Sequence, residues 1–349
     1  MYFNLSNEEI KKFANMFDMN ILDFNLLFNL SEDSYSHYFL DNIFCIFKSK
    51  NDLLYLVYSN YFNSIIFFSI IDNKKLNEIK NAHNFYISSF NYLYDNNLER
   101  DLIISISARD NNIKLWNINT LECLLNLKNI NENGFLFSAC FLNDNNKNFI
   151  ISSNYKNKDF LIKAELMKVF DLNGNKIKEI KNSDDDTFLI KNYYDSKLNK
   201  NYIIAGNNDN VKSYDFIENK IYKIYNDDDN KFYSIIIIND EEIIKLIVSS
   251  EIGNIRIWNF HSGELLNKIK INDTKLYGIC LCNNNFLLSG SDNKSIIIID
   301  INNGIIIKEL YGHNKAVLAI KKINHPLYGE CIISQGYQKD SIKLWEIRS

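Results

Sequence analysis

The three tryptophans of this chain all occupy the same place in one recurring pattern. Trp116, Trp258 and Trp345 each follow an aliphatic, a basic and a second aliphatic residue. Four degenerate copies carry another large apolar residue at that place, and the seven positions are Phe68, Trp116, Phe170, Tyr214, Trp258, Ile299 and Trp345. Successive positions lie 41 to 54 residues apart. An internal repeat of this length indicates an array of seven similar units.

Each unit is predicted to contain four β-strands, which in the second unit lie at about 85–92, 101–107, 113–118 and 122–127. These segments are apolar on both faces over long stretches, which is typical of sheets covered by neighbouring sheets. Asparagine-rich clusters separate them, and Asn tolerates the positive φ of tight turns. The two longest spacings indicate loop insertions in the second and third units. We therefore predict an all-β fold, a seven-bladed β-propeller over residues 20–349.

Closure of the ring is expected to need a strand from the start of the chain. The last unit ends after its third strand, and an additional β-like run stands at about residues 22–30. Placing that run as the fourth strand of the last blade removes two exposed sheet edges. Residues 1–19 are expected to form a separate N-terminal segment. It should contain a short helix over 7–18, because a capping box precedes an apolar stripe there.

The repeat resembles the WD40 family over nearly the whole chain. That family has a Gly-His pair upstream of the tryptophan, and Gly312-His313 stands 32 residues before Trp345 while Ala82-His83 stands 33 before Trp116. The family's turn Asp, six residues before the tryptophan, is present as Asp110. The resemblance implies a hydrogen-bond relay that stiffens a blade, expected in the second unit from His83, Ser105 or Ser107, Asp110 and Trp116. It implies structural roles for His83, Asp110, Trp116, Trp258, His313 and Trp345. The third to sixth units lack the His and are expected to rely on apolar packing.

A partner is expected to bind at one face of the ring. In a propeller, the loops between strands four and one and between strands two and three lie at the same end. Two of these loops carry acidic triplets, which would steer a Lys/Arg-rich segment toward this face. Aromatic side chains in the same loops would anchor it. The candidate partner-binding residues are Asp184, Asp185, Asp186, Asp227, Asp228, Asp229, Tyr61, Tyr155 and Tyr337. The triplets are also compatible with a set of solvated Asp-rich turns.

Charge and motifs argue against several classes of function. The net charge is -4 and no two arginines are adjacent, so the clustered basic face of a nucleic-acid-binding protein is missing. No phosphate-binding loop, nucleophile elbow or zinc-protease motif occurs, so we expect no enzyme, cofactor or metal. The apolar runs are too short to span a membrane. The six cysteines include no Cys-x-x-Cys, as is typical of buried thiols in a reducing cytosol.

These features favour a protein–protein interaction scaffold or adaptor in a multiprotein complex, located in the cytoplasm with the nucleus left open. The alternative is a substrate receptor of a cullin-type ubiquitin ligase. Such WD40 receptors carry Trp-Asp-x-Arg at the end of a third strand. The segment Trp345-Glu346-Ile347-Arg348 is similar, with Glu in place of the family's Asp.

Overall fold

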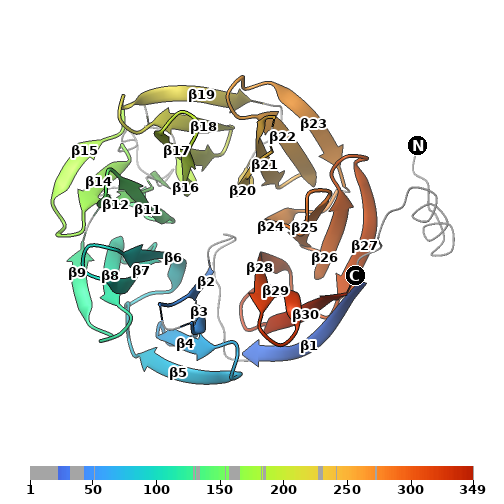
Figure 1. The fold of residues 1–349 in the computed structure, drawn as a ribbon, viewed down its shortest axis with the longest axis horizontal. Coiled ribbons are helices and arrows are strands. Elements are labelled where there is room, and N and C mark those ends of the chain that lie inside the picture. Colours follow the sequence, from blue (N-terminus) through green and yellow to red (C-terminus); the bar gives the residue numbers. More distant parts are fainter. Residues whose placement is uncertain are drawn as a thin grey trace.

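The computed structural model describes residues 23–31, 43–50, 52–128, 130, 134–153, 155–156, 166–181, 183, 186–226, 231–240, 242–271 and 273–348. Within them the chain forms seven four-stranded antiparallel sheets arranged around one axis (Figure 1). Each sheet is one blade, with its first strand nearest the axis. The predicted seven-bladed β-propeller is confirmed.

In blades 1 to 6 the strands follow chain order from the axis to the rim. Blades 1 and 2 contain β2 (Phe44–Lys48), β3 (Leu54–Ser59), β4 (Ile65–Ser69), β5 (Lys74–Ile79), β6 (Ile87–Asp95), β7 (Arg100–Ser107), β8 (Asn112–Asn117) and β9 (Cys123–Leu127). Blade 3 contains β11 (Ala139–Asp144), β12 (Lys147–Ser152), β14 (Lys168–Asp171) and β15 (Lys176–Glu179), with a small hairpin of β10 (Gly134–Phe135) and β13 (Tyr155–Lys156) beside it.

The remaining blades repeat the arrangement. Blades 4 and 5 contain β16 (Thr187–Asp195), β17 (Lys200–Asn207), β18 (Asn210–Asp215), β19 (Lys220–Asn226), β20 (Phe232–Asn239), β21 (Ile244–Ser250), β22 (Asn254–Asn259) and β23 (Leu265–Lys270). Blades 6 and 7 contain β24 (Leu276–Leu281), β25 (Phe286–Ser291), β26 (Ser295–Asp300), β27 (Ile305–Tyr311), β28 (Val317–His325), β29 (Gly329–Gly336), β30 (Ile342–Arg348) and β1 (Asp23–Ser31).

Burial explains why these apolar segments form stacked sheets. Every residue of β26 is buried, because neighbouring blades cover both faces of each inner strand. The outermost strand β5 contacts fewer neighbours and exposes Lys74 and Lys75. Asparagines supply several of the turns: Asn111 and Asn199 have φ values of 52° and 50°, a conformation that Asn adopts more readily than most residues.

Blade 7 combines the two ends of the described chain. β1 pairs antiparallel with β30, and Leu26 lies opposite Trp345. The Lys343 ammonium donates a hydrogen bond to Asn29 Oδ1 at 2.7 Å. Figure 1 shows this first strand lying along the last one. The closing strand expected at residues 22–30 is thus observed as β1, which removes the open edge of β30.

The predicted fold class needs one correction. We expected a propeller with an added short helix over residues 7–18, but the described residues contain strands, turns and bends and no helix. In the described residues the fold is therefore an all-β propeller with no added helix, and residues 7–18 themselves lie outside them. Among the residues that the structure describes, no helix is long and apolar enough to cross a membrane.

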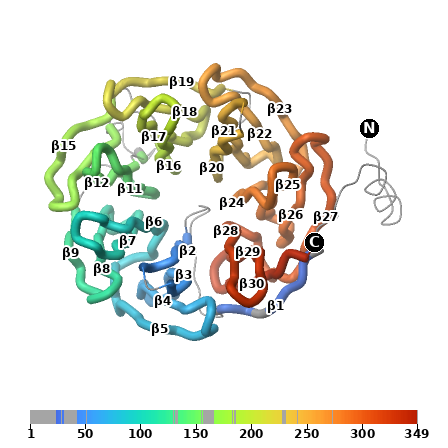
Figure 2. The backbone as a smooth tube through the Cα atoms, in the orientation of Figure 1, coloured from blue at the N-terminus to red at the C-terminus, as the bar shows by residue number. Residues whose placement is uncertain are grey.

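Two kinds of loop lie at the same face of the ring. Because the strands of each blade are antiparallel, the turns between second and third strands lie at the same end as the segments that lead from one blade to the next. We call this end the loop face, and the other end the opposite face. Figure 2 follows the chain around the ring from blade 1 to blade 7. The predicted partner-binding residues that the structure describes, Tyr61, Tyr155, Asp186 and Tyr337, lie in loop-face segments or directly beside them.

Candidate functional site

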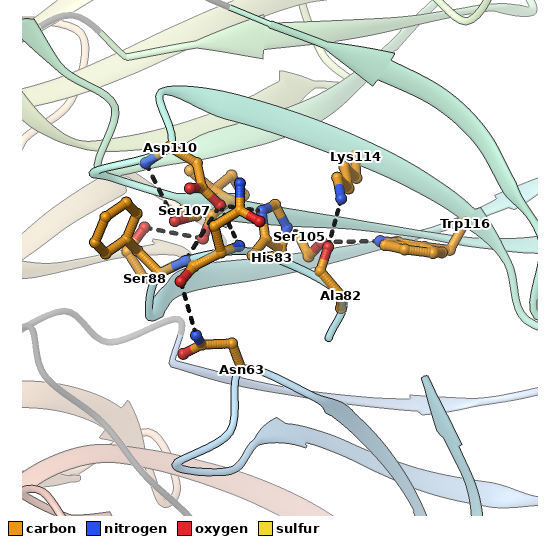
Figure 3. A network of polar contacts seen from close by, with 12 residues as sticks. Asn63, Ala82, His83, Ser88, Ser105, Ser107, Asp110, Lys114 and Trp116 are labelled. Atoms are coloured by element: carbon orange, nitrogen blue, oxygen red, sulfur yellow. Dashed lines mark hydrogen bonds and ion pairs between the residues drawn. The ribbon is translucent and has the colours of Figure 1, made fainter. Parts of the chain in front are cut away.

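Blade 2 contains the expected polar relay (Figure 3). His83, in the segment that enters the blade, places Nε2 2.7 Å from Ser105 Oγ. The Trp116 indole N–H donates to the same oxygen at 2.8 Å. Nδ1 of His83 lies 3.3 Å from the Asp110 carboxylate, which also accepts the backbone N–H of Asn84 at 2.8 Å. The serine of the relay is therefore Ser105, and the relay joins two strands, β7 and β8, to the loop-face turn and to the segment that enters the blade.

A second relay occurs in blade 7, and two of its members, Ser334 and Asp340, were not predicted. His313 Nδ1 lies 2.9 Å from Asp340 Oδ2, and its Nε2 lies 2.7 Å from Ser334 Oγ. Trp345 donates to Ser334 at 2.8 Å. Asp340 also accepts the backbone N–H groups of Asn314 and Lys315. Asp340 stands five residues before the tryptophan, so the six-residue spacing of Asp110 did not identify it.

Burial controls the charge of both relays. It lowers the pKa of His83 and of His313 by more than the neighbouring carboxylates raise it, so both imidazoles are neutral at pH 7. Burial alone would raise the pKa of Asp110 and of Asp340. Hydrogen bonds from the histidines and from backbone N–H groups outweigh it and leave both pKa values below their ordinary range. Each relay is thus a neutral His against an ionised Asp.

Trp258 lies in a different environment. It is buried in blade 5, and its ring centroid lies 6.0 Å from that of Tyr225 in blade 4. Both side chains belong to one hydrophobic cluster with Phe260. The cluster is consistent with the expectation that this blade relies on apolar packing. Only the two relays of blades 2 and 7 link a histidine to an aspartate and a tryptophan among the described residues.

Aromatic side chains gather where the loop face meets the axis. Tyr155 of β13 lies 4.9 Å from Phe137 and 4.8 Å from Phe188, measured between ring centroids. Phe137 and Phe188 are 6.0 Å apart, and Phe135 lies 6.1 Å from Phe137. We call Phe135, Phe137, Tyr155 and Phe188 the axial cluster. All four are partly exposed. Tyr155 was predicted as a binding residue, and the three phenylalanines were not.

Carboxylates also lie on the loop face. Asp186 directly precedes β16, and its charge adds to burial in raising the pKa of Tyr155. In blade 5, the Glu251 carboxylate lies 2.8 Å from the Lys275 ammonium and 3.2 Å from the Lys231 ammonium. The other predicted acidic residues, Asp184, Asp185, Asp227, Asp228 and Asp229, lie outside the described residues. The acidic triplets therefore stay a prediction, of which only Asp186 has a described environment.

The other two predicted tyrosines lie elsewhere on the loop face. Tyr337 is partly buried and packs against the same hydrophobic cluster as Phe137 and Phe188. Its backbone N–H donates to Ala316 O at 2.8 Å. Tyr61 is 47% exposed and lines a pocket of about 480 Å³ with Asn314, Lys315, Gln338, Lys339 and Asp340. The three candidate tyrosines therefore do not form one site.

Arg348, which carried the resemblance to ligase receptors, forms an ion pair with a neighbouring side chain. Its guanidinium donates to Glu346 within β30 at 2.8 Å. The side chain is 56% exposed and lies opposite Asp23 of β1. The arginine is thus an accessible group at the seam between the two ends of the described chain.

The described residues contain no group of three or more His, Cys, Asp or Glu side chains that is arranged to hold a metal ion. The loop face presents partly exposed aromatic side chains beside fixed charges. No protein-family model matches this sequence, and no curated protein matches it at a significant level. The fold therefore rests on the sheets and their topology.

Proposed function

We propose that this protein is a WD40-type propeller that acts as a protein-interaction scaffold, with a loop face that binds a basic segment of a partner protein. Propellers commonly serve as interaction scaffolds, although a fold by itself does not determine function. The WD40 assignment is supported by the two relays, which join His83 to Trp116 and His313 to Trp345 through a serine. These are the side chains that the resemblance implied.

The observation that carries the proposal is the axial cluster with Asp186 beside it. Tyr155 stands within 5 Å of the rings of Phe137 and Phe188, and the charge of Asp186 acts on its phenol. A Lys or Arg side chain placed on such rings gains both a cation–π attraction and an opposite charge. Aromatic anchors of this kind dominate the energetics of protein interfaces.

The acidic triplets extend this argument along the loop face. Asp184 and Asp185 directly precede Asp186, and Asp227–Asp229 precede the next blade. A group of carboxylates at one end of a propeller raises the rate at which a basic partner arrives and fixes its orientation. The proposed partner segment therefore carries several Lys or Arg residues, one of which rests on the axial cluster.

Binding of fluorescent basic peptides measures this directly. Replacing both Tyr155 and Phe188 by alanine should weaken binding by about tenfold or more. Replacing Asp184, Asp185 and Asp186 by asparagine should weaken it most at low salt. The matched control is Tyr194→Ala, because Tyr194 is a 51% exposed tyrosine of the same strand as Phe188 at the opposite face. Equal affinities for the wild type and the Tyr155/Phe188 variant would contradict the proposal.

The proposed role is binding without catalysis, and we place it in the cytoplasm. The location is supported by the cysteines, which are all free thiols in the described residues, as a reducing compartment would keep them. Fluorescent tagging of the chain tests the location, and the proposal predicts a signal outside the secretory compartments.

A further inference from the structure

A second group of aromatic side chains lies on the loop face over blades 1 and 2. Tyr61 and Phe62 occupy the turn between β3 and β4, and their ring centroids lie 5.8 Å apart. Tyr86, in the segment that enters blade 2, lies 6.3 Å from Tyr61. Phe85 is next to it in the chain. Phe62 is 72% exposed and Phe85 44%, which is unusual for phenylalanine in a protein with an extensive core.

Cations surround these rings. The Lys339 ammonium lies 4.8 Å from the Tyr61 ring centroid, and the Arg109 guanidinium lies 5.9 Å from that of Phe85. Lys315 lines the pocket next to Tyr61. Within the part of the chain that the structure describes, no carboxylate forms an ion pair with these three cations. We call the four rings and three cations the Tyr61 platform.

The two relays hold the platform in place. The Asp110 carboxylate accepts the backbone N–H groups of Asn84 and Phe85, and Asp340 accepts that of Lys315. Both carboxylate side chains are at most 3% exposed, so they point inward while the cations point outward. Asn63 donates to Asn84 O at 3.1 Å, which ties the turn of Tyr61 to the loop of Phe85 (Figure 3). The relay-bearing blades 7 and 2 therefore flank blade 1 and preorganise the surface above it.

We propose that the Tyr61 platform binds an acidic segment of a partner protein, in which two or three Asp or Glu side chains flank an aromatic or branched aliphatic residue. The apolar residue packs on Tyr61 and Phe62, and the carboxylates meet Lys315, Lys339 and Arg109. Preorganised aromatic and cationic groups are the features that give a surface both affinity and specificity. This site is independent of the axial cluster and has the opposite charge preference.

Charge complementarity favours a protein segment over a nucleic acid. Aromatic rings with cations also suit single-stranded nucleic acid, but a strand carries a phosphate at every nucleotide. The chain has a net charge of -4, and Asp186 and Glu251 lie on the same face toward blades 4 and 5. A polyanion that extended beyond the platform would be repelled there, whereas a segment with two or three carboxylates would not.

A peptide array provides the test. It should contain acidic peptides with a central Phe or Leu, copies with Asn and Gln in place of Asp and Glu, basic copies, and an oligothymidylate of 12 nucleotides as a separate probe. The full-length protein should bind the acidic peptides above the amide copies, and the preference should fall as salt is added. If the acidic peptides bind no better than the amide copies, or if the oligothymidylate binds more tightly and displaces them, the proposal is wrong.

Paired variants locate the binding. The double charge reversal Arg109→Glu with Lys339→Glu should weaken binding of the best acidic peptide by about tenfold or more. Lys147→Glu with Lys197→Glu is the matched control, since both lysines are exposed at the opposite face, Lys147 at the start of β12 and Lys197 in a turn. It should leave the affinity unchanged. Tyr61→Ala should weaken the acidic peptide and leave basic peptides unaffected. Equal losses of affinity for the acidic peptide in the two double variants would overturn the assignment to the Tyr61 platform. The affinity for basic peptides is measured in parallel, because it reports on the axial cluster and so tests the proposed function separately.

Discussion

The Asp340 carboxylate lies 2.9 Å from Nδ1 of His313 although 27 residues separate them in the chain. A Cβ atom on Gly336 would lie 2.1 Å from that carboxylate, so the close approach requires a glycine there. The same relationship joins Asp110 to His83 in blade 2. The two relays connect the blade interiors to loop-face turns. The stability of the fold and its dependence on pH should therefore depend on them.

Replacing Asp340 by alanine should destabilise the fold strongly. The change leaves buried His313 and two partly buried backbone N–H groups without their acceptor, which costs about 2–4 kcal/mol of unfolding free energy. The control is Asp273→Ala, because Asp273 has a side chain that is 91% exposed and forms a surface pair with Lys270, worth at most about 0.5 kcal/mol. Urea unfolding followed by tryptophan fluorescence measures both. Equal losses would show that the relay contributes no more than a surface ion pair.

Stability should fall as the solution becomes mildly acidic. Burial depresses the pKa of His83 and His313 below the ordinary value of 6.5. The unfolded chain therefore binds protons near pH 6.5 while the folded chain resists them, so lower pH favours unfolding. The urea midpoint should be level above about pH 7 and decrease between about pH 6.5 and 5.

A double variant separates the relays from other groups in this pH range. His83→Gln with His313→Gln should be less stable than the wild type at pH 7.5 but show a shallower decrease toward pH 5. Some decrease remains, because burial also lowers the pKa of His325. A decrease as steep as that of the wild type would contradict the assignment of the acid sensitivity to the relays.

Closure of the ring should depend on β1. Deleting residues 1–31 removes the strand that pairs with β30 and exposes a sheet edge, so the product should be insoluble or open. Deleting residues 1–22 leaves β1 in place and should give a folded, soluble chain. Size-exclusion chromatography and limited proteolysis compare the two. A compact and soluble 32–349 chain would contradict the closure.

Blades 6 and 7 approach each other too closely to admit a side chain at Gly290. A Cβ atom there would lie 2.2 Å from the carbonyl oxygen of Val317 in β28, and backbone cannot move aside as a side chain can. Gly290→Ala should therefore lower the unfolding free energy by about 2 kcal/mol or more. Gly206→Ala is the matched control in blade 4, because its nearest neighbour is the end of the Ile235 side chain at 3.3 Å. A similar effect of the two changes would count against this packing.

The blade pattern was predictable from the sequence because it reflects burial on both faces of each third strand. All seven predicted positions fall within third strands, from Phe68 in β4 to Trp345 in β30. The longer third unit does contain an inserted segment, with β13 paired to β10. In the second unit β6 and β7 have nine and eight residues, the same lengths as β16 and β17 in the fourth unit. The turn between β7 and β8 is two residues longer than the turn between β17 and β18.

The two proposed binding surfaces were less predictable because they combine residues from different blades. Tyr61 was a candidate from its loop, but the cations around it come from turns of blades 2 and 7, which no local pattern connects. Phe137 and Phe188 meet Tyr155 only because β11, β13 and β16 converge at the axis. Asp340 was missed since it stands five residues before its tryptophan, whereas Asp110 stands six before Trp116. The buried positions within one strand can be predicted from sequence periodicity. A surface made of loops from several blades depends on the three-dimensional arrangement of those blades.

Lysine-reactive cross-linking of the native complex, followed by mass spectrometry, tests most directly whether the loop face is where partners bind. The account predicts that cross-links to other proteins concentrate on the loop-face lysines Lys231, Lys275, Lys315 and Lys339. Lys147, Lys197 and Lys220, at the opposite face, should form few. Cross-links that concentrate on the second group and spare the first would contradict the central claim.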